Sequence, residues 1–78
     1  MRNEIIIKRP YRHFKGDLYY VHDLVEDTET GKMYVSYQAL YEPYKSYIRA
    51  LDMFLEEIPL DREDNITGQK YRFELFKG

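Results

Sequence analysis

The chain has 78 residues, with 12 Lys or Arg against 14 Asp or Glu, and contains no Cys and no Trp. This length fits one domain, residues 1–78, and the slight negative charge argues against a nucleic-acid partner. The absence of Cys excludes disulfides, a cysteine nucleophile and cysteine-based metal sites. No apolar run approaches the roughly 20 residues that span a bilayer, and no signal sequence follows Met1, so we expect a cytoplasmic protein.

The first third of the chain predicts two strands. A run of isoleucines predicts a short strand over Glu4–Lys8, and Pro10 should end the pairing because it has no N–H to donate. A turn around Gly16 precedes a longer strand, Leu18–Glu26. Strict alternation places four residues of this strand on one face: Tyr19, Val21, Asp23 and Val25. A polar Asp23 in mid-strand indicates a bulge or bend.

The clearest turn in the sequence is the polar segment 27–32. Gly31 stands where a hairpin loop needs a left-handed residue. Met33–Tyr41 then returns as the partner of Leu18–Glu26 in an antiparallel hairpin. One face of the returning strand is apolar and is the expected core face: Met33, Val35, Tyr37, Ala39 and Tyr41.

The second half of the chain predicts shorter elements. A loop around Pro43 leads to a short strand, Tyr47–Leu51. Asp52 can cap a helical turn that runs to Glu57, and apolar residues at helical spacing would cover one open end of a barrel: Leu51, Phe54, Leu55 and Ile58. After a charged loop, Tyr71–Phe76 alternates as the last strand.

These elements predict a mainly β fold, a small SH3-like barrel or roll with one short helical turn. Closure of the barrel would protect the edge strands, which a sheet of this size cannot otherwise hide. The residues expected to be mostly buried share apolar faces: Val21, Val35, Ala39, Leu51, Phe54 and Phe73.

No catalytic, metal or cofactor signature is present. His13 and His22 are the only imidazoles, and no other ligand stands at metal-site spacing from them. The Gly-x-Ser-x-Gly nucleophile pattern and a glycine-rich phosphate loop are both absent. The sequence therefore predicts no catalytic residue, no metal and no cofactor.

The unusual feature is an excess of tyrosine, with nine Tyr beside four Phe. Several phenols must lie at a rim, where they either close a small core or line a ligand groove. The candidate ligand-binding residues interleave aromatic and polar types: His13, Lys15, Tyr37, Gln38, Tyr47 and Arg49. A guanidinium presents a planar fork that suits carboxylate or phosphate. The alternative is that the arginines pair with acids on a charge-balanced surface.

Several blocks resemble a small bacterial family of unknown function. They are Tyr11-Arg12-His13-Phe14-Lys15-Gly16, Val35-x-Tyr37-Gln38-Ala39-Leu40-Tyr41, Tyr47-Ile48-Arg49-Ala50 and Met53-Phe54. The resemblance covers about residues 10–76. Tyr47 replaces the usual Trp, and Ala50 the usual Pro of an Arg-Pro pair. The resemblance implies a compact β-barrel-like domain and no established activity.

The favoured hypothesis is a non-enzymatic binding module for a small anionic metabolite or a peptide carboxylate. The alternative is a metabolite- or nucleotide-processing enzyme in which His13 is the acid/base and Arg49 holds an anionic group. A third, single-stranded nucleic-acid binding by aromatic and Arg stacking, conflicts with the acidic balance. Arg49 is expected in a concave, tyrosine-lined surface near Tyr37 and His13; the competing possibility is an ion pair with Glu42, Asp52 or Glu74. The oligomeric state and the partner of the N-terminal strand stay open.

Overall fold

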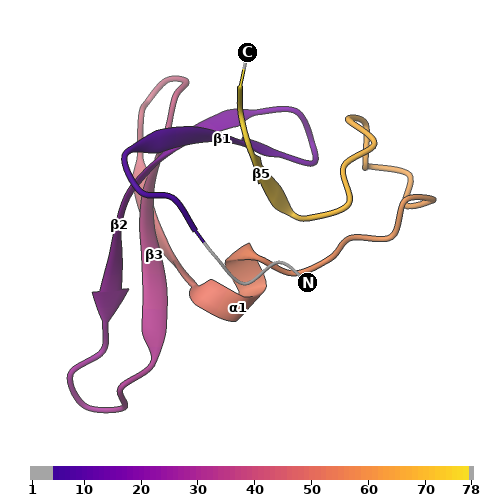
Figure 1. Ribbon diagram of the computed structural model, residues 1–78. Coiled ribbons are helices and arrows are strands. Elements are labelled where there is room, and N and C mark those ends of the chain that lie inside the picture. Colours follow the sequence, from indigo (N-terminus) through magenta and orange to yellow (C-terminus); the bar gives the residue numbers. More distant parts are fainter. Residues whose placement is uncertain (1–4, 78) are drawn as a thin grey trace.

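The computed structural model describes residues 5–77. Over these residues, five strands and one short helix follow in the order β1 (Arg9–His13), β2 (Leu18–Glu26), β3 (Met33–Ala39), β4 (Ser46–Ala50), α1 (Leu51–Phe54) and β5 (Phe73–Leu75). The strands form a single antiparallel sheet in the order β4-β3-β2-β1-β5 (Figure 1). The mainly β class with one short helix is confirmed. The sheet is open, with β4 and β5 at its edges, and is consistent with a small barrel-like or roll fold.

The β2–β3 hairpin is confirmed, although β3 ends at Ala39 rather than at Tyr41. Its turn is closed by the Asp27 N–H, which donates to the Lys32 carbonyl at 2.9 Å. Gly31 has φ +75°, the left-handed conformation that glycine adopts without steric cost. The hairpin projects beyond the rest of the sheet (Figure 1).

The bulge expected near Asp23 lies between Val21 and Asp23, where the β2–β3 register shifts. Beyond it, Leu24 is opposite the fully buried Val35, whereas Val25 is 37% exposed. Paired residues of neighbouring strands share a face of the sheet. The extra residue therefore turns Leu24 to the core side with Val21. The prediction that Asp23 and Val25 share the face of Val21 is wrong for this reason.

The N-terminal strand lies later in the chain than expected. Residues 5–8 are not a strand, Glu4 lies outside the described residues, and β1 begins at Arg9 and includes Pro10. Pro10 is paired with Tyr20, and its carbonyl accepts from the Phe76 N–H at 3.0 Å. The N and C=O groups of one strand residue point to the same side of the strand, so the Pro10 nitrogen faces the end of β5. The absence of its N–H therefore removes no hydrogen bond to β2.

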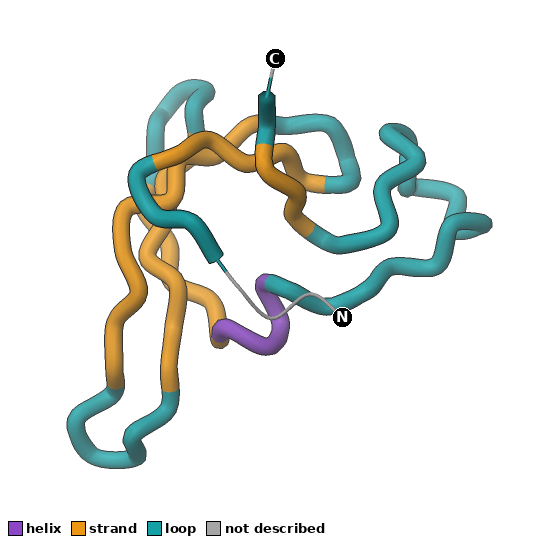
Figure 2. The backbone as a smooth tube through the Cα atoms, viewed as in Figure 1, coloured by secondary structure: helices purple, strands orange, loops and turns teal. Residues whose placement is uncertain are grey.

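The helical turn differs from its prediction in length and in its cap. α1 stops at Phe54, and its N-cap is Ala50, which makes no side-chain capping bond; Asp52 lies inside the first turn. The chain then loops away and returns to β5 (Figure 2). The two ends of this loop are joined by Ile58 N–H to Lys70 O at 2.7 Å and by Arg72 N–H to Glu56 O at 2.9 Å. The last strand was expected over Tyr71–Phe76, and the observed strand β5 is shorter and covers Phe73–Leu75.

An aromatic stack joins α1 to β5. The rings of Phe54 and Phe73 are parallel within 1° at a centroid distance of 4.1 Å, and the Tyr37 ring lies 5.4 Å from each of them. Five of the six expected core residues are buried, and Leu51 is half-buried. The core also contains buried residues that were not among the six: Tyr11, Phe14, Tyr37, Ala50 and Ile58.

Phe54→Ala should destabilise the fold by about 3–5 kcal/mol, because it removes one ring of the central stack and leaves a cavity. The neighbouring Met53 is 46% exposed, so Met53→Ala is a matched control with an expected effect of about 0.5 kcal/mol or less. Urea unfolding followed by far-UV circular dichroism measures both. Equal unfolding midpoints for the two variants would remove Phe54 from the core.

Candidate functional site

The core side of the sheet continues outward to the edge strand β4. Tyr37 is paired with Tyr47, and Val35 with Arg49. Exposure rises along this row, because Tyr37 is buried, Arg49 is half-buried and Tyr47 is 39% exposed. The Tyr37 and Tyr47 rings are 5.6 Å apart. One layer of side chains thus begins in the core and ends in solvent.

Two further tyrosines extend this layer. The Tyr19 ring lies 5.6 Å from both Tyr37 and Tyr41, and the Tyr19 and Tyr41 hydroxyls are 2.6 Å apart. Burial and then the hydrogen bond to Tyr41 raise the pKa of Tyr19 well above its usual value. We call these four residues the tyrosine cluster: Tyr19, Tyr37, Tyr41 and Tyr47. Tyr19 and Tyr41 were not named as site residues, although alternation had placed Tyr41 on the face of Tyr37.

Arg49 lies beside this cluster without a carboxylate partner. Its Nε donates to the Tyr37 hydroxyl at 3.3 Å. Over residues 5–77, neither Nη makes a hydrogen bond or ion pair, and the expected alternatives Glu42, Asp52 and Glu74 do not reach the guanidinium.

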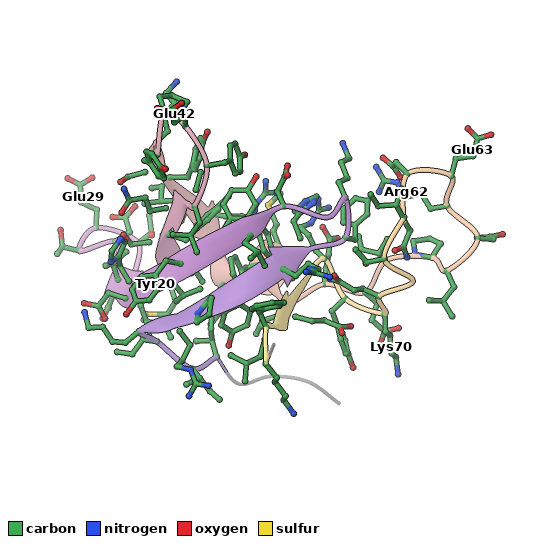
Figure 3. The ribbon with its side chains drawn as sticks, turned by 90° about the horizontal axis from the view of Figure 1, so that it is seen from above. Tyr20, Glu29, Glu42, Arg62, Glu63 and Lys70 are labelled. Carbon is green, nitrogen blue, oxygen red and sulfur yellow. The ribbon has the colours of Figure 1, made fainter. Side chains whose placement is uncertain are left out.

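The acids proposed for Arg49 are placed elsewhere. Glu42 lies at the tip of the β3–β4 loop (Figure 3), and Glu74 accepts the backbone N–H groups of Lys70 and Tyr71. The acidic partners in the described ion pairs are Asp64, for Lys15 and Arg62, and Glu56, for Arg72. Arg49 therefore remains a half-buried cation whose charge no protein group in the described chain neutralises.

His13 packs among aromatic rings on the same side of the sheet. Its ring centroid lies 4.4 Å from Phe14, 4.9 Å from Phe73 and 6.2 Å from Tyr19. Nδ1 accepts the Lys15 N–H at 3.1 Å, so the proton of the neutral ring is on Nε2. Burial, followed by the charges of Arg72, Arg49 and Lys15, lowers the pKa of His13 to about 4. The imidazole is neutral at pH 7 and lies in a region of positive potential.

The other two predicted site residues are not part of this layer. Lys15 lies in the loop after β1, with its Nζ 3.7 Å from Asp64. Gln38 follows Tyr37 in β3 and so faces the other side of the sheet. There its Oε1 is 2.8 Å from His22 Nε2, and its Nε2 donates to the Tyr44 carbonyl at 2.9 Å. Of the six predicted residues, Tyr37 contacts both Tyr47 and Arg49, and His13 is linked to Tyr37 through the ring of Tyr19, which lies near both.

Residues 5–77 contain no group of three or more His, Cys, Asp or Glu side chains that could hold a metal ion. Over the same residues, no helix has the length and apolar character needed to cross a membrane.

Comparison with known proteins identifies the family. The family described as "Protein of unknown function (DUF1653)" matches residues 9–75, and the chain belongs to it. A crystal structure of a DUF1653 protein from Bordetella bronchiseptica is similar, with a TM-score of 0.72 and 28% identity over 94% of this chain and 90% of that one. No curated protein matches the sequence.

The lowered pKa of His13 predicts a specific loss of stability in mild acid. The unfolded chain binds a proton near pH 6.5 and the folded chain only near pH 4, so stability from neutral His13 is complete above pH 6.5 and is lost as the pH falls toward 4. Because His13 is only half-buried, we expect a loss on the order of 1–2 kcal/mol.

Urea unfolding at pH 7 and at pH 4.5 measures this loss. His13→Asn, which keeps an acceptor near the Lys15 N–H, should lose about 1–2 kcal/mol less than the parent between these pH values. His22→Gln is the matched control. It retains His13, so its free energy of unfolding should fall between pH 7 and pH 4.5 by as much as that of the parent. The prediction is contradicted if His13→Asn loses as much unfolding free energy between these pH values as the parent does.

Proposed function

We propose that this protein is a non-enzymatic binding module for the carboxylate of a small anionic metabolite or a peptide, with Arg49 as its anchor. The observation that carries the proposal is a half-buried guanidinium that donates to the Tyr37 hydroxyl and meets no acid over residues 5–77. A partly desolvated cation of this kind is stabilised by an anionic ligand. The Tyr37 bond orients the fork and leaves both Nη groups for the two oxygens of a carboxylate.

The other candidate residues take supporting roles in this proposal. Tyr47 offers an exposed ring beside Arg49, and His13 offers an Nε2 proton on a neutral imidazole. Lys15 adds positive charge to the surroundings of His13. Gln38 acts from the opposite face, where its bond to the Tyr44 carbonyl holds the loop that leads into β4.

The enzyme alternative receives less support. A general base or acid works best with a pKa near the operating pH, and that of His13 is lowered to about 4. Its aromatic surroundings and its bond from the Lys15 N–H suit a structural imidazole. The net charge of −2 likewise disfavours nucleic acid.

The proposal extends to the wider setting of the protein. We place it in the bacterial cytoplasm and regard the domain as SH3-like, with α1, which follows the β4 edge, packed on the β5 edge by the stack of Phe54 on Phe73. We also propose that the Tyr-Arg-His-Phe-Lys-Gly and Val-x-Tyr-Gln-Ala-Leu-Tyr blocks are shared across the family because they supply His13 and Tyr37.

The test is titration of the protein with succinate, a small dicarboxylate, followed by NMR of the His13 imidazole. Arg49→Lys keeps the charge but loses the planar fork, so the Kd for succinate should rise about tenfold while the melting temperature stays nearly unchanged. Arg9→Lys is the matched control, because Arg9 is exposed on β1, and its Kd should equal that of the parent.

Two results would contradict the proposal. One is a parent protein that does not respond to succinate or to any other small carboxylate. The other is an Arg49→Lys variant that unfolds at lower temperature and binds succinate as tightly as the parent, since Arg49 would then serve only the fold.

A further inference from the structure

The edge strand β4 is uncovered in the described structure. Over residues 5–77 it pairs with β3 alone, and Ser46 is exposed, as is Ile48, at 65%. The five residues of β4 include no Pro or Lys, which commonly blunt an edge, and its one charged residue, Arg49, is half-buried on the core side, where it opposes edge pairing unless an acid meets it. The opposite edge, β5, has three residues and contains Glu74. An unpaired edge with one inward charge that meets no acid over residues 5–77 is a template for a strand that supplies the acid.

The hydrogen-bonding pattern between β4 and β3 shows which N–H and C=O groups of β4 point away from the sheet and can bond to another strand. The Ala39 N–H donates to the Lys45 carbonyl at 2.9 Å, and the register continues through Tyr37 opposite Tyr47 and Val35 opposite Arg49. Backbone groups along a strand point alternately to its two sides. The groups of Tyr47 and Arg49 therefore face β3, and the N–H and C=O of Ser46 and Ile48 face away from the sheet.

We propose that β4 binds an extended peptide as an added antiparallel strand, with an acidic side chain of the peptide opposite Arg49. This inference rests on the proposed function and names its ligand. Arg49 would form a non-hydrogen-bonded pair with the added strand, in which opposite Cα atoms lie about 4.5 Å apart. An acid at that position is within reach of the two Nη groups, which have no partner over residues 5–77.

The two neighbouring positions define the rest of the motif. The next peptide residue is opposite Ile48 on the outer face, where a β-branched apolar side chain fits. The following residue is opposite Tyr47 on the face of the tyrosine cluster, where an aromatic ring fits. Read in the antiparallel direction, the peptide is acidic, β-branched, aromatic, for example Glu-Val-Tyr.

A second copy of the chain fits this edge less well. Antiparallel pairing of two β4 strands about Ile48 would place Arg49 opposite the partner's Tyr47. Both guanidiniums would then be covered without gaining a carboxylate, which is costly for a partly buried charge. A peptide that carries an acid supplies the missing group, so charge complementarity favours the peptide.

The experiment measures the Kd of the acetylated and amidated peptide Thr-Glu-Val-Tyr-Thr by fluorescence anisotropy of a labelled form. N-methylation of the Val amide blocks its bond to the Ile48 carbonyl and should weaken binding at least about tenfold. N-methylation of the Tyr amide, which faces away from β4, is the matched control. Glu to Gln in the peptide should also weaken binding about tenfold, and this difference should vanish with Arg49→Gln.

Variants of the protein test the same edge from the other side. Ile48→Pro removes an N–H that faces away from β3 and should weaken peptide binding about tenfold, whereas Ile48→Val should not. Circular dichroism establishes that Ile48→Pro is folded. If it is not, the N-methylated peptides on the parent protein decide the question.

Three outcomes would overturn the inference, and they separate it from the proposed function. In the first, N-methylation does not change the Kd of the peptide, and free succinate binds as tightly as the peptide. This outcome leaves carboxylate recognition by Arg49 intact and contradicts strand addition. Binding of neither peptide nor succinate removes both proposals. Concentration-dependent dimerisation in sedimentation that Ile48→Pro abolishes, without peptide binding, assigns the edge to a second copy of the chain.

Discussion

The stack of Phe54 on Phe73 closes a structure whose sheet does not close. α1 continues directly from β4 at one edge, and β5 is the other edge. Over residues 5–77 no strand ladder joins β4 to β5, and an isolated bridge between Glu57 and Tyr71 links the segments that follow α1 and precede β5. Parallel rings 4.1 Å apart bridge this gap, and Tyr37 packs against both. The ion pair of Arg72 with Glu56 lies on the same seam. Side-chain burial, together with the two backbone hydrogen bonds between residues 56–58 and 70–72, thus takes the place of the continuous ladder that closes a complete barrel.

The candidate site is a continuation of this closure. Tyr37 contributes its ring to the stack and its hydroxyl to Arg49, so the position of the guanidinium depends on the packing of the core. The guanidinium lies between the core and the solvent. Water solvates it incompletely, and over residues 5–77 no carboxylate compensates for the lost hydration. The same packing that stabilises the domain therefore holds a half-buried charge that meets no carboxylate over residues 5–77, and this is the basis of the proposed anion site.

Local patterns in the sequence predicted the parts of the fold that depend on local chemistry. The hairpin, the turn at Gly31 and the bulge near Asp23 each follow from residues within a few positions of one another. The strand through Pro10 could not be predicted this way, because its tolerance depends on where the distant β5 ends. The side-chain arrangement of the candidate site likewise follows only in part from local pattern. Alternation places Tyr47 and Arg49 on one face of β4 and Tyr37 on the core face of β3. The Tyr19–Tyr41 hydroxyl pair instead joins β2 to the segment after β3 through a register that the sequence does not reveal.

The open edge and the aromatic closure are two aspects of one arrangement. A ladder between β4 and β5 would occupy the outward N–H and C=O groups of Ser46 and Ile48 and would leave no edge for a ligand. Closure by Phe54 and Phe73 stabilises the domain, and over residues 5–77 those groups stay unpaired beside Arg49. A backbone edge supplies affinity without sequence preference, and an adjacent cation adds selection for acidic partners. If β4 binds a peptide as proposed, the stacked pair is what closes the domain while the β4 edge stays available for the added strand.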